Sequence, residues 1–198
     1  MNNSRPANRG FYTDDINQCP DDVRYKGQEK FPTKVLVWVA FSEKGISAPL
    51  IKKSRTGAIN EDVYLNECLI KRLLPFIKSK HRDGKYLFWP DLSTSHYAND
   101  NIEWMNSNVK YVPKTSNPPN VPQARPIEKF WGQLAQKVYA KGWQAKTQTQ
   151  LIRRIKAKLK EFDKKNLQCL MVGLKTKLRK IADHGVLALF KNLNINDK

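Results

Sequence analysis

The sequence predicts an α/β fold with a mixed sheet. Three short runs, residues 35–41, 86–89 and 109–112, are apolar and rich in β-branched or aromatic residues, as strands are. Segments with apolar residues at helical spacing lie between and after these runs. The chain has 198 residues, which is long enough for one domain with a substantial core.

The first two predicted strands form a hairpin. Residues 35–41 are continuously apolar, a pattern typical of a strand that is buried on both faces. Residues 42–45 read as a turn, and residues 46–51 are the expected partner strand. Pro49 lacks a backbone N–H, so it favours an edge or bulge position in that strand.

Helices follow the hairpin. Asn60 is a favoured N-cap residue, and apolar residues at helical spacing predict a helix from there to about Lys80. A short helix at residues 97–106 separates the last two strands. Five prolines in residues 113–126 predict a rigid irregular connection, and Pro126 suits the first position of the helix that follows to about Tyr139.

The two ends of the chain differ in character. Residues 1–33 are rich in Asn, Asp, Pro and Gly and read as an irregular arm or loop. Residues 151–170 combine a basic tract with an apolar stripe, and a further basic helix is expected at residues 171–181. We therefore treat residues 34–198 as a single domain with C-terminal basic helices.

The composition points to a polyanionic partner. The chain carries 36 basic and 18 acidic residues, a net charge of +18, and nucleic acid neutralises such a charge; a merely soluble basic surface is the alternative. Cys19, Cys68 and Cys169 are scattered without CxxC spacing, which argues against a disulfide framework or a zinc site. No long apolar stretch predicts a membrane span, and no apolar segment near the N-terminus predicts a secretory signal, which leaves cytosol or nucleus.

Two acids stand out within this basic chain. Asp91 directly follows an apolar run, and Glu128 lies in the first turn of an amphipathic helix. Each has a plain structural interpretation, because Asp is a favoured cap and Glu interacts well with a helix N-terminus. The elements between them can return both acids to one sheet edge. Two carboxylates with open coordination positions suit Mg²⁺, or Mn²⁺ in its place.

The sequence around these acids resembles a known family. The runs FWPDLSTSHYA and VKYVPKTSNPPNVPQARPIEKFWGQLAQKVY look like the catalytic core of mariner-superfamily DDE transposases, as do VLVWVAFSEKGISAPL and NEDVYLNECL. The resemblance implies a ribonuclease-H-like fold that cuts and joins DNA with an Asp-Asp-Glu triad and Mg²⁺. On that resemblance Asp91 is the second acid of the triad and Glu128 is the third.

The first acid departs from the family pattern. In the family it lies on the first sheet strand, a few dozen residues before the strand that corresponds to residues 35–41. Asp14 and Asp15 fall too close to that strand, and no apolar run leads into them. We therefore expect the first strand and its Asp to be missing, with Asp14 or Asp15 as a substitute in the alternative and Asp21 and Asp22 as weaker candidates. The family's N-terminal DNA-binding region is also not recognisable, so we interpret the chain as a truncated transposase.

Three functional hypotheses follow. The first is a metal-dependent transposase domain, the second a non-catalytic DNA-binding remnant, and the third, for which no RNP or KH motif is visible, a basic RNA-binding protein. The expected partners are DNA and, as an open option, a second copy of the chain, and the expected compartment is the nucleus. His96 either approaches the acid site or serves packing or capping. The residues predicted to contact nucleic acid are Arg125, Lys129, Arg153, Arg154, Lys156 and Lys158.

Overall fold

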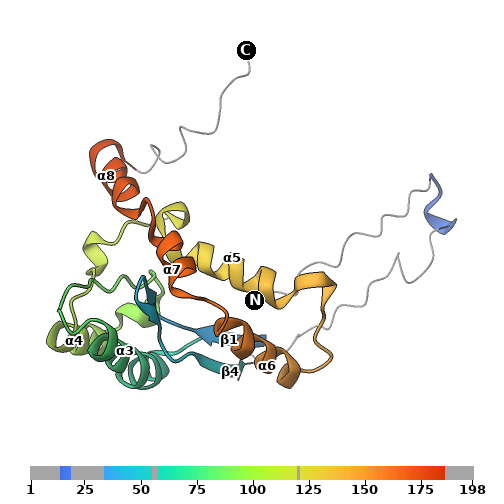
Figure 1. Ribbon diagram of the computed structural model, residues 1–198, viewed down its shortest axis with the longest axis horizontal. Helices are drawn as coiled ribbons and strands as arrows, with labels where there is room; N and C mark the ends of the chain where they lie inside the picture. The colour runs from blue at the N-terminus through green and yellow to red at the C-terminus, as the bar shows by residue number, and fades with distance from the viewer. Residues whose placement is uncertain (1–13, 19–33, 55–57, 120, 186–198) are drawn as a thin grey trace, which may run out of the picture.

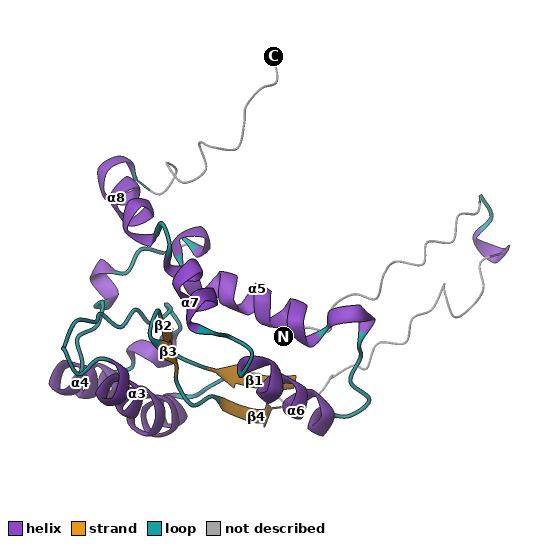
Figure 2. Cartoon of the chain, in the orientation of Figure 1, coloured by secondary structure: helices purple, strands orange, loops and turns teal. Residues whose placement is uncertain are grey.

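The computed structural model describes residues 14–18, 34–54, 58–119 and 121–185, and confirms the mixed α/β class (Figure 1). Strand β1 (Lys34–Trp38) pairs antiparallel with β4 (Leu50–Ser54), in a register that sets Lys34 opposite Ser54 and Trp38 opposite Leu50. Strands β2 (Phe41–Ser42) and β3 (Gly45–Ile46) form a small hairpin between them. Figure 2 shows these short strands surrounded by helices.

Strand β1 and the residues just after it separate two apolar cores. Val35 and Val39 pack on one side with α5 (Pro126–Val138), α6 (Gln148–Leu159) and α7 (Lys164–Met171). Trp38 and Ala40 pack on the other side with the helix of residues 61–80 and with α4 (Asn99–Asn108). Successive side chains of a strand point to opposite faces, so the continuous apolar run serves both cores, as its pattern predicted.

The helix of residues 61–80 begins and ends where the sequence predicts. It consists of α2 (Glu61–Val63), a π-helical segment η2 (Tyr64–Leu73) and α3 (Leu74–Lys80). The side chain of Asn60 caps it, because its Oδ1 accepts a hydrogen bond from the Val63 N–H at 2.9 Å. The wide π turn was not predicted, since hydrophobic spacing alone does not separate it from an α-helix.

The hairpin is more broken than predicted. The expected strand at residues 35–41 stops after Trp38, and the Ala40 N–H donates to Ser47 Oγ at 2.9 Å. The expected partner at residues 46–51 is likewise two strands, with Pro49 in the gap between them. A proline removes one ladder hydrogen bond, and the Ser47 hydroxyl replaces a backbone partner at this bend.

The two later strands were predicted too generously. Residues 86–89 and 109–112 form only a parallel bridge between Phe88 and Tyr111. The Phe88 N–H donates to the Lys110 carbonyl and the Val112 N–H donates to the Phe88 carbonyl, both at 2.9 Å. No described strand pairs with residues 86–89 on their other side, and a strand is maintained by its neighbours rather than by propensity.

The remaining elements are helical. Pro126 is the first residue of α5, as predicted. The basic tract of residues 151–170 bends between α6 and α7, where Asp163 Oδ1 accepts from the Asn166 N–H at 2.7 Å and caps α7. Helix α8 (Leu174–His184) follows α7. The described residues also form short 3₁₀ turns: η1 (Ile16–Gln18), η3 (Thr94–Tyr97), η4 (Lys114–Ser116), η5 (Pro122–Ala124) and η6 (Ala140–Gly142).

The described residues also bear on the expectations about membrane spans, cysteines and the N-terminal arm. No helix in the described part of the chain combines the length and hydrophobicity that crossing a bilayer requires. Cys68 is buried and Cys169 exposed, and both are free thiols, while Cys19 lies outside the described residues. Of the predicted arm at residues 1–33, only residues 14–18 are described.

Candidate active site

Asp91 and Glu128 line the same groove, which has a volume of about 1050 Å³. The groove is lined by residues 35–43 and by residues 85–91, and the first turns of α5 contribute Ile127, Glu128 and Trp131. The groove therefore lies between strand β1 and the bridged segment that leads into Asp91. The proline-rich connection returns the chain to this groove, so two acids far apart in the sequence line the same groove.

Asp91 is fixed through one of its two carboxylate oxygens. Oδ1 accepts a hydrogen bond from the Ser93 N–H at 2.9 Å and lies 2.6 Å from Nδ1 of His96. Oδ2 accepts no hydrogen bond from any described residue. The side chain is 59% exposed, so this second oxygen belongs to a carboxylate that solvent or an ion can approach.

The surroundings of Asp91 favour its ionised form. Partial burial by itself would raise the pKa of the carboxyl group, but the contact with His96, the Ser93 N–H and the nearby Arg125 guanidinium together lower that pKa. Asp91 is therefore a carboxylate at neutral pH, which is the form that binds a divalent cation.

Glu128 is positioned by helix α5. It is the third residue of the helix, its N–H donates to the Arg125 carbonyl at 3.2 Å, and its side chain is exposed. Phe130, two residues after Glu128, is fully buried and stacks on Phe41 with ring centroids 4.9 Å apart. Apolar packing thus holds α5 in place, and its first turn, which carries Glu128, lines the groove.

A buried polar network connects the two acid-bearing segments. Asn117 Nδ2 and Arg125 Nη1 both donate to the carbonyl of Pro90, at 2.9 and 3.2 Å. Asn117 Oδ1 accepts from Trp89 Nε1 at 2.7 Å and from Arg125 Nη2 at 2.8 Å. The residue before Asp91 is therefore bonded directly to the N-cap residue of α5, which ties the positions of Asp91 and Glu128 together.

Sequence reasoning missed Asn117. It is 3% exposed and occupies the centre of this network, where it also donates to the Tyr97 hydroxyl at 2.7 Å. The only signal in the sequence is a polar residue in front of two prolines, a combination that also occurs in ordinary turns. Its importance comes from partners far away in the chain.

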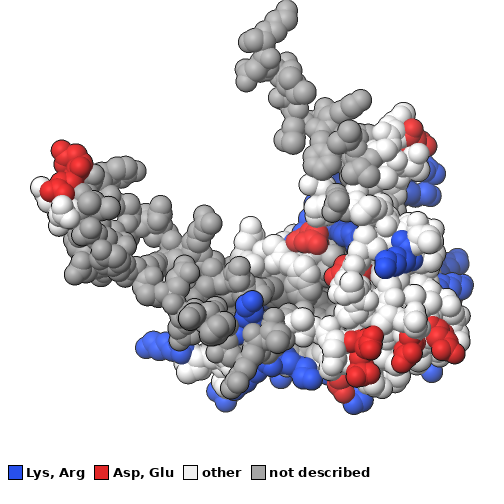
Figure 3. All heavy atoms as spheres, turned by 180° about the vertical axis from the view of Figure 1, so that it is seen from behind, with Lys and Arg blue, Asp and Glu red and all other residues white. Residues whose placement is uncertain are grey.

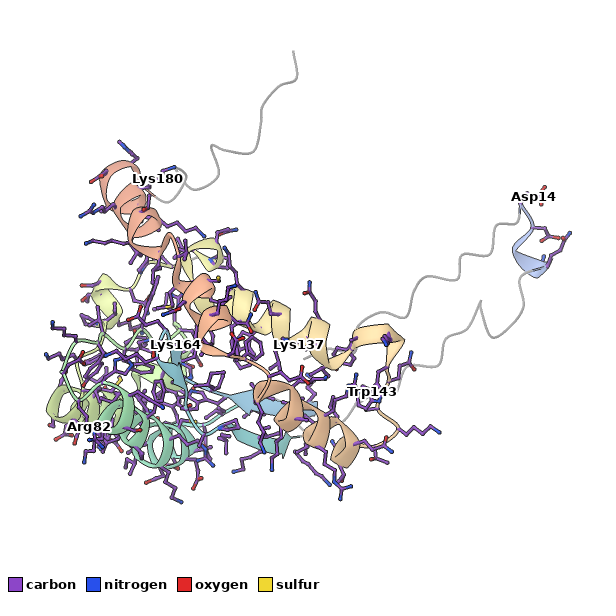
Figure 4. All side chains as sticks on the ribbon, viewed as in Figure 1. Asp14, Arg82, Lys137, Trp143, Lys164 and Lys180 are labelled. Atoms are coloured by element: carbon purple, nitrogen blue, oxygen red, sulfur yellow. The ribbon has the colours of Figure 1, made fainter. Side chains whose placement is uncertain are left out.

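The predicted nucleic-acid contacts divide into two groups. Arg125 is 8% exposed, bonded internally and placed over the Trp89 ring, so the structure gives it a structural role instead of a free guanidinium for phosphate. Arg154 donates to the Val138 carbonyl at 2.5 Å and covers the Trp143 ring, which Figure 4 labels, and Lys158 pairs with Glu161 at 2.6 Å. Those with exposed side chains are Lys129, Arg153 and Lys156.

Basic side chains do not gather into a single patch on the face that is shown in Figure 3. Lys and Arg lie along the lower edge and one side of that face, with Asp and Glu among them.

Lys177 on α8 donates to the Gln123 carbonyl at 2.9 Å, and burial, together with nearby Lys129, lowers the pKa of Lys177. Two lysines therefore approach each other beside the start of α5.

A third described acid, Glu43, also lines the groove, but it forms no metal-binding cluster with Asp91 and Glu128. No cluster of three or more His, Cys, Asp or Glu side chains suited to a metal occurs among the described residues. Asp14, a candidate substitute, lies apart from the helices and strands of residues 34–185 in Figure 4, and neither Asp14 nor Asp15 lines the groove. Asp21 and Asp22 lie outside the described residues.

Solved structures share this architecture. A Mos1 transposase paired-end complex with left transposon end superposes with a TM-score of 0.67 at 14% identity, over 90% of this chain and 51% of that one. The crystal structure of the catalytic domain of Mos1 mariner transposase superposes with a TM-score of 0.63 at 15% identity, over 78% of this chain and 80% of that domain. The chain has the fold of the Mos1 mariner transposase catalytic domain.

The extent of the Mos1 match is itself informative. This chain spans about half the length of the Mos1 chain in the paired-end complex and most of the isolated catalytic domain. Other Mos1 catalytic-domain structures contain Mn or Mg together with Raltegravir. No protein-family model and no curated protein sequence matches the chain.

Proposed function

We propose that this chain is the catalytic-domain fragment of a DNA transposase and acts by metal-dependent DNA strand cleavage and transfer. The observation that carries the proposal is the shared groove: Asp91 and Glu128 both line it, in a fold that matches the Mos1 catalytic domain. Neither acid alone would distinguish an active site from a helix cap. Together, in one groove, they supply two of the carboxylates that metal-dependent phosphoryl transfer uses.

The donor set fits Mg²⁺ or Mn²⁺. Both acids offer carboxylate oxygens, and Mg²⁺ is commonly held by one or two carboxylates, with waters and substrate phosphates in the other positions. Asp91 would contribute its unbonded Oδ2 and Glu128 its exposed carboxylate. A bound divalent ion supplies stabilisation of the charge that develops on the attacking and leaving oxygens. The residues of the chain hold and orient these two carboxylates.

The proposal includes a missing first strand. Strand β1 is paired with β4 on one edge, and the segment that ends in Asp91 is bridged to Tyr111 on one side only. The groove lies between β1 and this segment, and none of the described residues forms a strand there. A strand in this position would complete the sheet and bring a third acid to Asp91 and Glu128. Without it the aligned metal geometry is incomplete, so we expect weak activity.

DNA is the proposed partner. The Mos1 comparison includes a complex with a transposon end, and the net charge of +18 favours a polyanion. Of the predicted contacts, Lys129, Arg153 and Lys156 have exposed side chains. Because this function would act on chromosomal DNA, we propose a nuclear location. We also propose a second copy of the chain as a partner.

Nicking of supercoiled plasmid tests the function. We expect the purified chain to relax plasmid slowly with Mn²⁺ and more slowly with Mg²⁺, and EDTA to stop the reaction. Asp91→Asn and Glu128→Gln should each reduce the rate at least about 100-fold, since each removes a proposed metal ligand. Glu103→Gln, on α4, is the matched control and should nick like the wild type. Nicking that survives both substitutions would contradict the proposal.

A non-catalytic DNA-binding remnant is the second candidate, favoured by the absence of a three-acid metal cluster among the described residues. It predicts DNA binding without nicking at any concentration of either metal. Its affinity should fall steeply with salt, by about 10³-fold or more between 50 and 200 mM if six or more phosphates are neutralised. Binding that is insensitive to salt would exclude this candidate as well.

A further inference from the structure

His96 is held rigidly beside Asp91. It lies in η3, is 8% exposed, and its ring stacks on the ring of Tyr64 with centroids 3.9 Å apart and planes inclined by 20°. Tyr64 is fully buried and makes an edge contact with Trp38 of β1. The imidazole is therefore clamped against the core and cannot turn into solvent without breaking this packing.

The turn that carries His96 is also anchored. Asn101 of α4 is fully buried, and its Nδ2 donates to the Ser95 carbonyl at 2.6 Å. Tyr97, the next residue, donates its hydroxyl to the Val112 carbonyl at 2.9 Å. Residues on both sides of His96 are thus fixed, so the ring presents Nδ1 in a defined place.

Nδ1 of His96 faces the carboxylate of Asp91. Nδ1 lies 2.6 Å from Oδ1, outside the alignment of an ordinary hydrogen bond, and the Ser93 N–H approaches the same oxygen. Two contacts on Oδ1 restrict rotation of the carboxylate. The other oxygen, Oδ2, is left without a described hydrogen bond. Asp91 itself is on an irregular segment, so its orientation needs such a restraint.

We infer that His96 is a positioning residue, which fixes the orientation of the Asp91 carboxylate so that Oδ2 is held available to a divalent cation. The metal-binding role of this restraint rests on the proposed function, whereas the contact between His96 and Asp91 is part of the structure whatever the function. Partners that orient a metal ligand typically change metal affinity by about 10–100-fold when they are removed. A histidine that served packing alone would have no such effect.

Two substitutions separate positioning from packing. His96→Asn places an amide N–H near the position of Nδ1, whereas His96→Gln places it near the position of Nε2. Both remove the ring that stacks on Tyr64, so they should lose similar thermal stability. Tyr64→Phe keeps the stack and removes a buried hydroxyl that has no hydrogen-bond partner, and it serves as the packing control.

The readout is Mn²⁺ binding by the full chain at a fixed pH of 7.5, followed by electron paramagnetic resonance. We expect His96→Asn and Tyr64→Phe to bind within about threefold of the wild type, and His96→Gln to bind at least about 10-fold more weakly, approaching Asp91→Asn. Equal affinities for His96→Asn and His96→Gln at equal stability would overturn the inference.

A second measurement does not depend on metal. Long-range ¹H–¹⁵N spectra of the wild-type imidazoles should show a proton on Nδ1 of His96, and its resonance should move in Asp91→Asn. A His96 that carries its proton on Nε2 alone overturns the inference whatever the metal result. A wild type that binds no Mn²⁺ overturns the proposed function, and the imidazole spectrum then decides separately whether His96 fixes Asp91.

Discussion

Asp91 and Glu128 share a groove but rest on supports of opposite kinds. Asp91 follows an irregular segment and is held by polar contacts: His96 lies against its carboxylate, and Asn117 and Arg125 bond the carbonyl of the preceding residue. Glu128 begins a regular helix whose buried face consists of fully buried apolar side chains, Phe130, Leu134 and Val138. The difference indicates that single polar substitutions can displace Asp91 in a folded protein, whereas displacing Glu128 requires damage to the core.

The largest expected effect is on the Glu128 side. Phe130 is fully buried between Phe41 and Phe162, with ring centroids 4.9 and 4.7 Å away. Phe130→Ala should lower the free energy of unfolding by about 3–5 kcal/mol, because it leaves a cavity in addition to the lost burial. Urea denaturation measures this change. Gln133→Ala, on the exposed face of α5, should stay within about 0.5 kcal/mol, and a similar loss in both would show that α5 is not held by its apolar face.

An intermediate effect is expected where the two supports meet. Arg125→Met keeps much of the side-chain volume but leaves the buried Pro90 carbonyl and Asn117 Oδ1 with one donor fewer each. We expect a loss of about 2–3 kcal/mol in the free energy of unfolding, since hydrogen bonds to charged groups contribute more than neutral ones. Lys129→Met on the exposed side of the same helix is the control. Equal behaviour of the two variants would mean that Arg125 is not part of the support of Asp91.

The smallest expected effect comes from Asp91 itself. Its pKa is lowered in the folded protein from an unfolded value of about 3.9, so it contributes stability above pH 4 that is lost as the pH falls through the folded pKa. The side chain is 59% exposed, so solvent screening limits this contribution to about 0.5 kcal/mol or less. The difference in unfolding free energy between the wild type and Asp91→Asn should therefore shrink between pH 6 and pH 2.5.

Other acids with lowered pKa values, such as Glu161 and Asp83, occur in both proteins and cancel from that comparison. A difference that grows as the solution becomes more acidic would have the wrong sign. It would show that burial outweighs the contacts with His96, Ser93 and Arg125.

The sequence identified both acids but not what holds them. Asp91 and Glu128 are visible because each follows a change in the apolar pattern, at the end of a run and at the start of a helix. Asn117 and Tyr64 are not visible, since their importance lies in contacts with residues 20 or more positions away. Arg125 was assigned to nucleic acid because a sequence displays charge but not burial, and its guanidinium is bonded inside the protein.

Strand lengths show the same division. The run at residues 35–41 is apolar throughout, and the structure uses both faces of it, but where the strand stops is decided by Ser47 and Pro49 on the returning segment. Residues 86–89 have strand-like composition and form a single bridge, because pairing depends on a neighbour that the composition does not reveal.

The sequence by itself determined the α/β class, the helix limits at Asn60, Lys80 and Pro126, and the pair of acids, because capping, proline geometry and periodicity act between residues close in the chain. Only the tertiary structure decided that both acids line one groove, that Arg125 and Asn117 connect them, and that His96 lies against Asp91. Those facts depend on burial and on contacts between distant segments, which exist only when the chain has folded.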